Sequence, residues 1–217
     1  MKPNDQAILP VFGRRPAAPV SNSWRTALPW PLAVIDFEAS SLDEDSYPIE
    51  VGLALWPAPD EPILSWSVLI RPAGDWVRRG HWSPASAKVH GIRGSDLLAH
   101  GRSPEWVASA LNKALGPGAV SWCDGGPYDA HWARALFKAG GVRPTFALGD
   151  WHRLVPLLGV QARERALTWL EKAPARHRAR TDAEQLLFAL AHAIGVEVGP
   201  AQDLAQRLPG LAMEAAT

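Results

Sequence analysis

The order of apolar patterns along the chain is the feature that most restricts its fold. Three short apolar runs, at residues 32–37, 48–56 and 63–70, follow one another with tight connections between them. Short runs bounded by proline and polar residues are typical of β-strands, and three in succession favour an antiparallel meander. The first part of the chain therefore predicts three adjacent strands of one sheet.

A helical spacing of apolar residues prevails later in the chain. It covers residues 104–115, 128–139, 151–158, 161–170 and 181–194. Two further short strand-like segments, 119–122 and 145–148, lie between the helical ones. A meander followed by alternating helices and strands indicates an α/β protein, with a five-stranded mixed sheet flanked by helices.

The 217 residues have the length of one ordinary domain. Residues 1–29 contain five prolines and no apolar period, which indicates a flexible N-terminal tail. Residues 209–217 are small and predict a fraying C-terminal tail, so the folded domain is expected over residues 30–208. No stretch approaches the ~18 apolar residues of a membrane span, and no secretory signal is recognisable. We therefore expect a cytoplasmic protein without membrane contact.

Charge and cysteine content exclude two further classes. The 22 basic residues balance the 22 acidic ones, so the chain as a whole has no net positive charge that would attract nucleic acid. Local basic patches are still possible. One cysteine excludes a disulfide scaffold and a cysteine-rich zinc site.

Two acids stand at the end of the first apolar run, in the sequence Val34-Ile-Asp36-Phe-Glu38. Alternate residues of a strand point to the same face, so Asp36 and Glu38 project together. Two carboxylates held close in a largely buried strand repel each other unless a cation neutralises them, and such oxygen ligands suit Mg²⁺ or Mn²⁺. The alternative is that both acids lie beyond the strand end, in water.

Three later residues extend this pattern, although each also has an ordinary structural interpretation. Asp129 stands at the start of a predicted helix, where acids often act as caps. Asp182 enters the last helix, where the helix dipole favours a negative charge. His177 precedes that helix and could be a solvated loop residue.

Taken in order, these residues resemble the motifs of the DEDDh 3′–5′ exonucleases. This family includes the proofreading subunit of bacterial DNA polymerase III, ribonuclease T and oligoribonuclease. The matching residues are Asp36-Phe-Glu38, then Asp129 at a helix start, then His177 with Asp182 five positions later. The segment His-Gly-Ile at 90–92, ahead of a helix, also resembles the family, and the resemblance covers roughly residues 31–195.

The resemblance implies a ribonuclease H-like fold and an exonuclease domain over residues 30–208. Its activity would be hydrolysis of phosphodiester bonds at the 3′ ends of single-stranded DNA or RNA, with release of nucleoside 5′-monophosphates. Four carboxylates would hold two divalent cations, Mg²⁺ or Mn²⁺. Asp36 would bridge them, Glu38 and Asp182 would hold the cation that activates water, and Asp129 would serve the other. His177 would be the general base.

The sequence departs from the family pattern at two points. Ala-Ser-Ser follows Glu38 where the family often has Thr-Thr-Gly. Gly125 occupies the place of an asparagine that often stands four residues before the second-motif acid. Its neighbour Asp124 is therefore a rival for that acid. Asp129 is preferred because an aromatic residue precedes it and a helical apolar face follows it.

Basic and aromatic residues near these motifs are candidates for binding the nucleic acid. A loop-like stretch over residues 78–90 contains Trp82, a candidate platform for base stacking. Arg176, Arg178 and Arg180 surround His177 and are candidates for contact with phosphates. The alternative is that Trp82 belongs to the core and that the arginines form a solvated face.

A second class of function is a non-catalytic nucleic-acid-binding or polymerase-associated module with the same fold. Loss of an acid or of the histidine would mark it, and all five of these residues are present. The resemblance is compatible with a homodimer and with polymerase association, since the family includes both.

Overall fold

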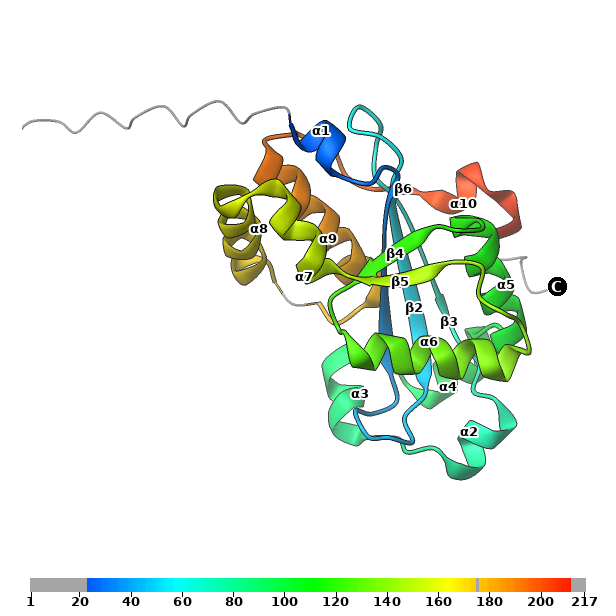
Figure 1. Cartoon of the computed structure of the whole chain (residues 1–217). Helices are drawn as coiled ribbons and strands as arrows, with labels where there is room; N and C mark the ends of the chain where they lie inside the picture. The colour runs from blue at the N-terminus through cyan, green and yellow to red at the C-terminus, as the bar shows by residue number, and fades with distance from the viewer. Residues whose placement is uncertain (1–22, 175, 212–217) are drawn as a thin grey trace, which may run out of the picture.

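A six-stranded sheet forms the middle of the structure, in the order β5-β4-β1-β2-β3-β6. The computed structural model describes residues 23–174 and 176–211. Helices cover both faces of the sheet (Figure 1). The strands are β1 (Leu32–Ala39), β2 (Pro48–Trp56), β3 (Leu64–Leu69), β4 (Val120–Cys123), β5 (Ala147–Asp150) and β6 (Gln202–Asp203).

The strand directions confirm the predicted mixed sheet. β2 pairs antiparallel with both β1 and β3, which is the meander expected from the three apolar runs. β4 pairs parallel with β1, and β5 pairs parallel with β4. The sequence prediction of five strands was one too few. β6 has two residues and pairs with β3 at Leu64 and Ser65, and a strand this short leaves no apolar run that could reveal it.

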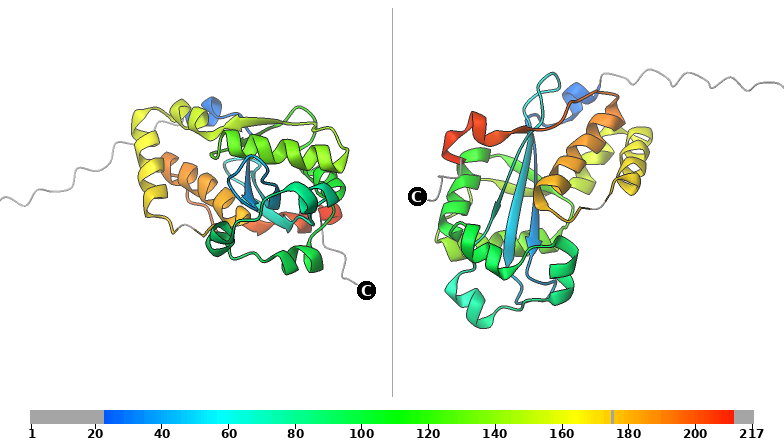
Figure 2. Two further views of the ribbon diagram at one scale, coloured as in Figure 1. Left: turned by 90° about the horizontal axis from the view of Figure 1, so that it is seen from below. Right: turned by 180° about the vertical axis from the view of Figure 1, so that it is seen from behind.

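The residues of β1 alternate between two cores, one on each face of the sheet. Ala33, Ile35 and Phe37 pack in one core, whose helical side is formed by α5 (Pro104–Leu115) and α6 (Pro127–Gly140). Leu32 and Val34 pack in the other, against α7 (Trp151–Leu154), α8 (Val160–Lys172) and α9 (Ala179–Ile194). In the view from below, β1 and β2 lie between α6 and α9 (Figure 2, left).

The segment predicted as loop-like, residues 78–90, contains short helices, and the helix expected after residues 90–92 is present. α2 (Gly74–Arg79), α3 (Pro84–His90) and α4 (Gly94–His100) have six or seven residues each, too few to show an apolar period. One local signal was available, because Ser83 caps α3 by accepting the Ser86 N–H at 3.2 Å and Pro84 follows it.

Packed structure extends past both predicted domain boundaries. α1 (Trp24–Ala27) lies within the predicted N-terminal tail, yet Trp24 and Leu28 are buried in the core. At the other end, Leu211 is buried and its carbonyl accepts the indole N–H of Trp66 at 3.2 Å. Burial of large apolar side chains outweighs the local proline and glycine signals here. Residues 1–22 and 212–217 of the predicted tails lie outside the described residues. The remaining elements are η1 (Val155–Leu158), α10 (Leu204–Arg207) and η2 (Pro209–Leu211).

Among the described residues, no helix combines the length and the apolar character needed to cross a membrane.

Gly52 sets the distance between α9 and the sheet. It lies on β2 directly opposite Asp36 of β1. A Cβ atom at this position would overlap the backbone of Ala179 and Arg180 at the start of α9. Only glycine therefore allows the first turn of α9 to lie directly on β2, and that close approach brings Asp182 toward β1.

We expect Gly52→Ala to lower the free energy of unfolding by about 1–3 kcal/mol, because the added methyl group must displace backbone atoms. Gly94→Ala is the matched control, since a Cβ there meets no atom within 4 Å and Gly94 has an ordinary φ. Urea unfolding of the three proteins measures the effect. Equal stability of the two variants would show that α9 does not depend on Gly52.

Candidate active site

The carboxylates of Asp36, Glu38 and Asp182 form one group, in which an oxygen of each lies within 4.8 Å of the others. Asp36 and Glu38 continue the face of β1 that α9 covers, because strand residues alternate between faces. Asp182 lies in the first turn of α9. The structure thus brings together three of the four acids that the sequence singled out, and it does so through the contact of α9 with the sheet.

Burial and mutual repulsion raise the pKa values of all three acids. The pKa of Glu38 is raised to about 8, first by burial and then by the charges of Asp182 and Glu50. The pKa of Asp36 is raised well above its usual range by burial and by the neighbouring acids. Burial also raises the pKa of Asp182. A group of hard oxygen donors that resists ionisation in this way fits a divalent cation, whose charge would stabilise the ionised form.

Asp129 approaches the group from α6. Its side chain is in the first turn of that helix and the residue is 1% exposed. One carboxylate oxygen accepts the Gly125 N–H at 2.9 Å. Burial and the charge of Asp124 raise the pKa of Asp129 to about 6. Among the neighbouring acids, Asp129 is the one whose charge raises the pKa of Asp36 the most. Its carboxylate nevertheless lies outside the group of three that Asp36, Glu38 and Asp182 form.

The structure gives a physical reason for the glycine at position 125, where the resembled family often has asparagine in its second motif. A Cβ atom at Gly125 would lie 2.6 Å from the Asp129 carboxylate, so a larger residue would push this acid away. Asp124 is exposed, yet its charge raises the pKa of Asp36 and Asp129. Both candidates for the second-motif acid thus lie near the group, with Asp129 buried and Asp124 in contact with solvent.

Glu50 is a further acid at the site, and the sequence reasoning missed it. It stands directly opposite Glu38 in the pairing of β1 with β2, and its side chain is 2% exposed. Arg178 donates two hydrogen bonds to it, at 2.9 and 2.6 Å, and the Ala179 N–H donates a third at 3.2 Å. A glutamate within an apolar strand, as in Pro48-Ile-Glu50-Val, was the available signal. The ion pair ties the start of α9 to β2.

His177 lies beside Asp182 and directly precedes Arg178, the residue that pairs with Glu50. It is exposed and has φ +48°, in the left-handed region that few residues other than glycine adopt. Its charge lowers the pKa of Asp182, and the backbone N–H groups of Arg176 and Arg178 act in the same direction. The segment before α9 therefore wraps around the Asp182 carboxylate and presents the imidazole to solvent next to it.

The structure uses two of the three candidate phosphate-binding arginines internally. Arg178 pairs with Glu50, and Arg180 pairs with Glu184 at 3.0 Å while also donating to Ser65. Arg176 is exposed. Trp82 is half-buried against the small apolar cluster around Ile92, and its ring meets that of the buried His90 edge to face at 6.4 Å.

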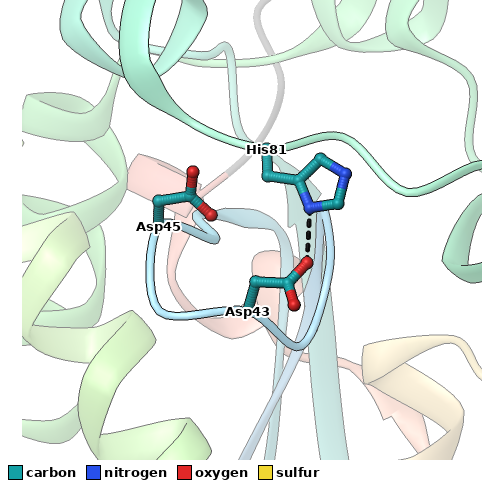
Figure 3. Close-up of side chains that lie close together, drawn as sticks. All are labelled: Asp43, Asp45 and His81. Atoms are coloured by element: carbon teal, nitrogen blue, oxygen red, sulfur yellow. Dashed lines mark hydrogen bonds and ion pairs between the residues drawn. The ribbon is translucent and has the colours of Figure 1, made fainter.

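A second group of metal-ligand type lies where the loop after β1 meets the segment between α2 and α3. Asp43, Asp45 and His81 are all exposed, and one ligand atom of each lies within 4.8 Å of the others. The imidazole Nδ1 of His81 pairs with the Asp43 carboxylate (Figure 3). Solvent hydrates these acids, so their mutual repulsion is weaker than in the half-buried group of Asp36, Glu38 and Asp182.

No known family model matches the chain, and no curated protein matches it. Solved structures do. The chain is similar to Exonuclease I of E. coli in complex with a dA16 oligonucleotide, with a TM-score of 0.54 and 12% identity over 84% of this chain and 42% of that one. The zinc-bound form of the E. coli enzyme with single-stranded DNA has a TM-score of 0.54 and 13% identity, with the same coverage.

The chain therefore spans less than half the length of these neighbours. At such low identity the likeness shows a common fold. The α/β architecture, with its antiparallel first strands and flanking helices, is the ribonuclease H-like fold of the exonuclease. The fold class expected from the sequence is confirmed.

The raised pKa values predict a pH dependence of stability in the metal-free protein. Glu38 titrates near pH 4.3 in an unfolded chain and near 8 in the fold, so between these values the folded state binds the extra proton. The free energy of unfolding must then fall as pH rises through this window. We expect Glu38→Gln to reduce that fall and to be more stable than the wild type at pH 8 in EDTA.

Urea unfolding at pH 5 and pH 8 in EDTA measures this effect. Glu171→Gln is the matched control, because Glu171 is exposed on α8. A wild-type stability that is the same at both pH values, or that rises, would contradict the repulsion among these half-buried acids.

Proposed function

We propose that the chain is a metal-dependent 3′–5′ exonuclease. It hydrolyses phosphodiester bonds of single-stranded nucleic acid and releases nucleoside 5′-monophosphates. The observation that carries this proposal is the half-buried group of Asp36, Glu38 and Asp182, whose carboxylates lie close together and repel one another unless a cation neutralises them. The fold shared with Exonuclease I, which was solved with single-stranded DNA, supports the same class of substrate.

Four acids would hold the metal in this proposal. Asp36, Glu38 and Asp182 would be joined by Asp129, and the oxygen donors suit two divalent cations, Mg²⁺ or Mn²⁺. When bound, such cations supply a nucleophilic water and stabilise charge on the phosphate and the leaving oxygen. The protein contributes orientation, because β1, α6 and α9 each fix their acids on regular backbone.

His177 would accept a proton from the attacking water. Imidazole titrates near neutral pH and is therefore suited to this role. Asp182 lies next to it, and the charge of His177 lowers the pKa of that acid. Arg178, the residue after His177, is held against β2 by its ion pair with Glu50. This contact limits the positions open to the imidazole of His177. Water attacks the phosphorus directly, so no covalent enzyme intermediate is needed.

The test uses single-stranded DNA and RNA oligomers blocked at one end or the other. We expect digestion with Mn²⁺ or Mg²⁺ when the 5′ end is blocked, no digestion when the 3′ end is blocked, and none in EDTA. A 3′ block removes the only end that the proposed activity uses. Release of fragments from a circular single strand would instead indicate an endonuclease.

Asp36→Ala should lower the digestion rate by at least about 10³-fold, because it removes the acid that faces all the others. Asp60→Ala is the matched control, since Asp60 is exposed and pairs with Arg25. An Asp36→Ala protein with a rate near that of the wild type would refute metal-dependent catalysis at this site. Binding without cleavage by the wild type would favour the non-catalytic module.

We expect His177→Ala to lower turnover by about 10²–10⁴-fold and to leave the affinity for Mn²⁺ nearly unchanged. The wild-type rate should fall at low pH as the imidazole is protonated, and the residual rate of the variant should lack that decline. The measurement is a pH–rate profile of both proteins at saturating Mn²⁺. Identical profiles would assign the proton transfer to another group.

A further inference from the structure

A groove of about 840 Å³ lies between α2 and α6. The residues that matter to its chemistry are Ser46, Trp76, Arg79, His131, Arg134 and Lys138. Figure 1 shows α2 beside α6, next to the loop that connects β1 and β2. We refer to this cavity as the α2–α6 groove. The acids of the proposed catalytic group are not among its lining residues, so it is a separate feature.

One end of the α2–α6 groove lies at the level of the first turns of α6, on a different face of that helix from Asp129. Ser46, in the loop after β1, accepts the indole N–H of Trp132 through its hydroxyl at 2.9 Å. Its carbonyl lies 3.2 Å from Nε2 of His131. Asp129 is two residues before His131 on the same helix. The groove therefore begins beside the first turn of α6, where Asp129 lies, and follows the helix away from it.

Positive charge follows the wall of the groove that α6 forms. His131, Arg134 and Lys138 are three and four positions apart, so they share one face of the helix. They span about 10 Å along the helix axis at 1.5 Å per residue. Throughout residues 23–174 and 176–211, no ion pair involves Arg134, Lys138 or Arg79 on the facing wall.

Two acids also line the groove, and among the described residues neither forms an ion pair with Arg79, Arg134 or Lys138. Asp75 is already paired with Arg78 on α2. Asp45 belongs to the exposed group with Asp43 and His81. Arg79, Arg134 and Lys138 thus remain as cations available to an anionic ligand.

An aromatic side chain completes the groove. Trp76 of α2 is half-buried and stacks on the buried Tyr47, with ring centroids 5.5 Å apart and planes at 11°. Tyr47 holds the indole in place against the groove. Aromatic side chains beside a row of cations are the usual means by which proteins bind single strands without reading their sequence.

We propose that the α2–α6 groove binds the part of a single-stranded nucleic acid that leads away from the scissile bond. The inference rests on the proposed function and adds the path of the polymer. The groove also supplies cations for the phosphates, because Arg178 and Arg180 near the catalytic acids already pair with Glu50 and Glu184. Arg134 and Lys138 bind phosphates, and Trp76 contacts a base or sugar.

The test compares Arg134→Gln/Lys138→Gln with the matched control Arg153→Gln/Arg163→Gln, which removes the same charge from exposed positions on α7 and α8. Affinity for a fluorescent single-stranded 20-mer is measured by anisotropy in EDTA. We expect about tenfold weaker binding for the groove variant. The slope of log affinity against log salt should become shallower by about 1.4, or 0.7 for each lost phosphate contact. The control should match the wild type.

A one-nucleotide substrate separates this inference from the proposed function. Hydrolysis of the p-nitrophenyl ester of thymidine 5′-monophosphate with Mn²⁺ should stay within twofold of wild type in the groove variant, because this ester is too short to reach the groove. Arg134→Lys/Lys138→Arg, which keeps both charges, should retain affinity for the 20-mer.

Unchanged affinity and salt slope in the groove variant would overturn the inference, as would a wild type that does not bind the 20-mer. An equal loss in the control variant would also overturn it, since the effect would then reflect total charge. Groove-dependent binding without hydrolysis of either substrate would refute the exonuclease proposal and leave the groove standing.

Discussion

Repulsion among half-buried carboxylates is the constraint on which the rest of the site depends. β1 and α9 place Asp36, Glu38 and Asp182 together, where burial strengthens each unfavourable contact. Such an arrangement persists only if other interactions hold the elements in place. Two core layers on opposite faces of β1 supply that support, and Gly52 lets α9 lie directly on β2. The stability of the fold thus maintains a local arrangement that is unfavourable until a cation binds.

The Glu50–Arg178 pair resolves a second conflict at the same place. Glu50 lies opposite Glu38 and would add to the repulsion if it were unpaired. Arg178 neutralises it with two hydrogen bonds and also lowers the pKa of Glu38. Breaking a buried ion pair by removal of one partner leaves an uncompensated charge, which is strongly unfavourable. The same contact fixes the backbone next to His177, so one ion pair serves both the sheet and the proposed general base.

Apolar patterns predicted the sheet and the long helices well because burial on a regular backbone repeats at a fixed spacing. The acids were found because their order resembles a family pattern. Features that lack a period were missed, as with the seven-residue helix α3 and the two-residue strand β6. Arg178 was assigned to substrate from its position in the sequence, yet its partner Glu50 is distant in the chain. Only the packing of the start of α9 on β2 reveals that contact.

The neutral total charge of the chain conceals a separation of charge along α6. Its first turn holds the buried Asp129, and the groove-facing cations Arg134 and Lys138 follow about one and a half and two and a half turns later. An anionic polymer would be repelled at the acidic end until a cation binds there, and attracted at the basic end throughout. In the proposed function, binding of the polymer and binding of a metal would then be separable, because the groove would hold the strand whether or not the acids hold a cation. A chain with zero net charge can therefore bind a polyanion locally, which whole-chain composition could not reveal.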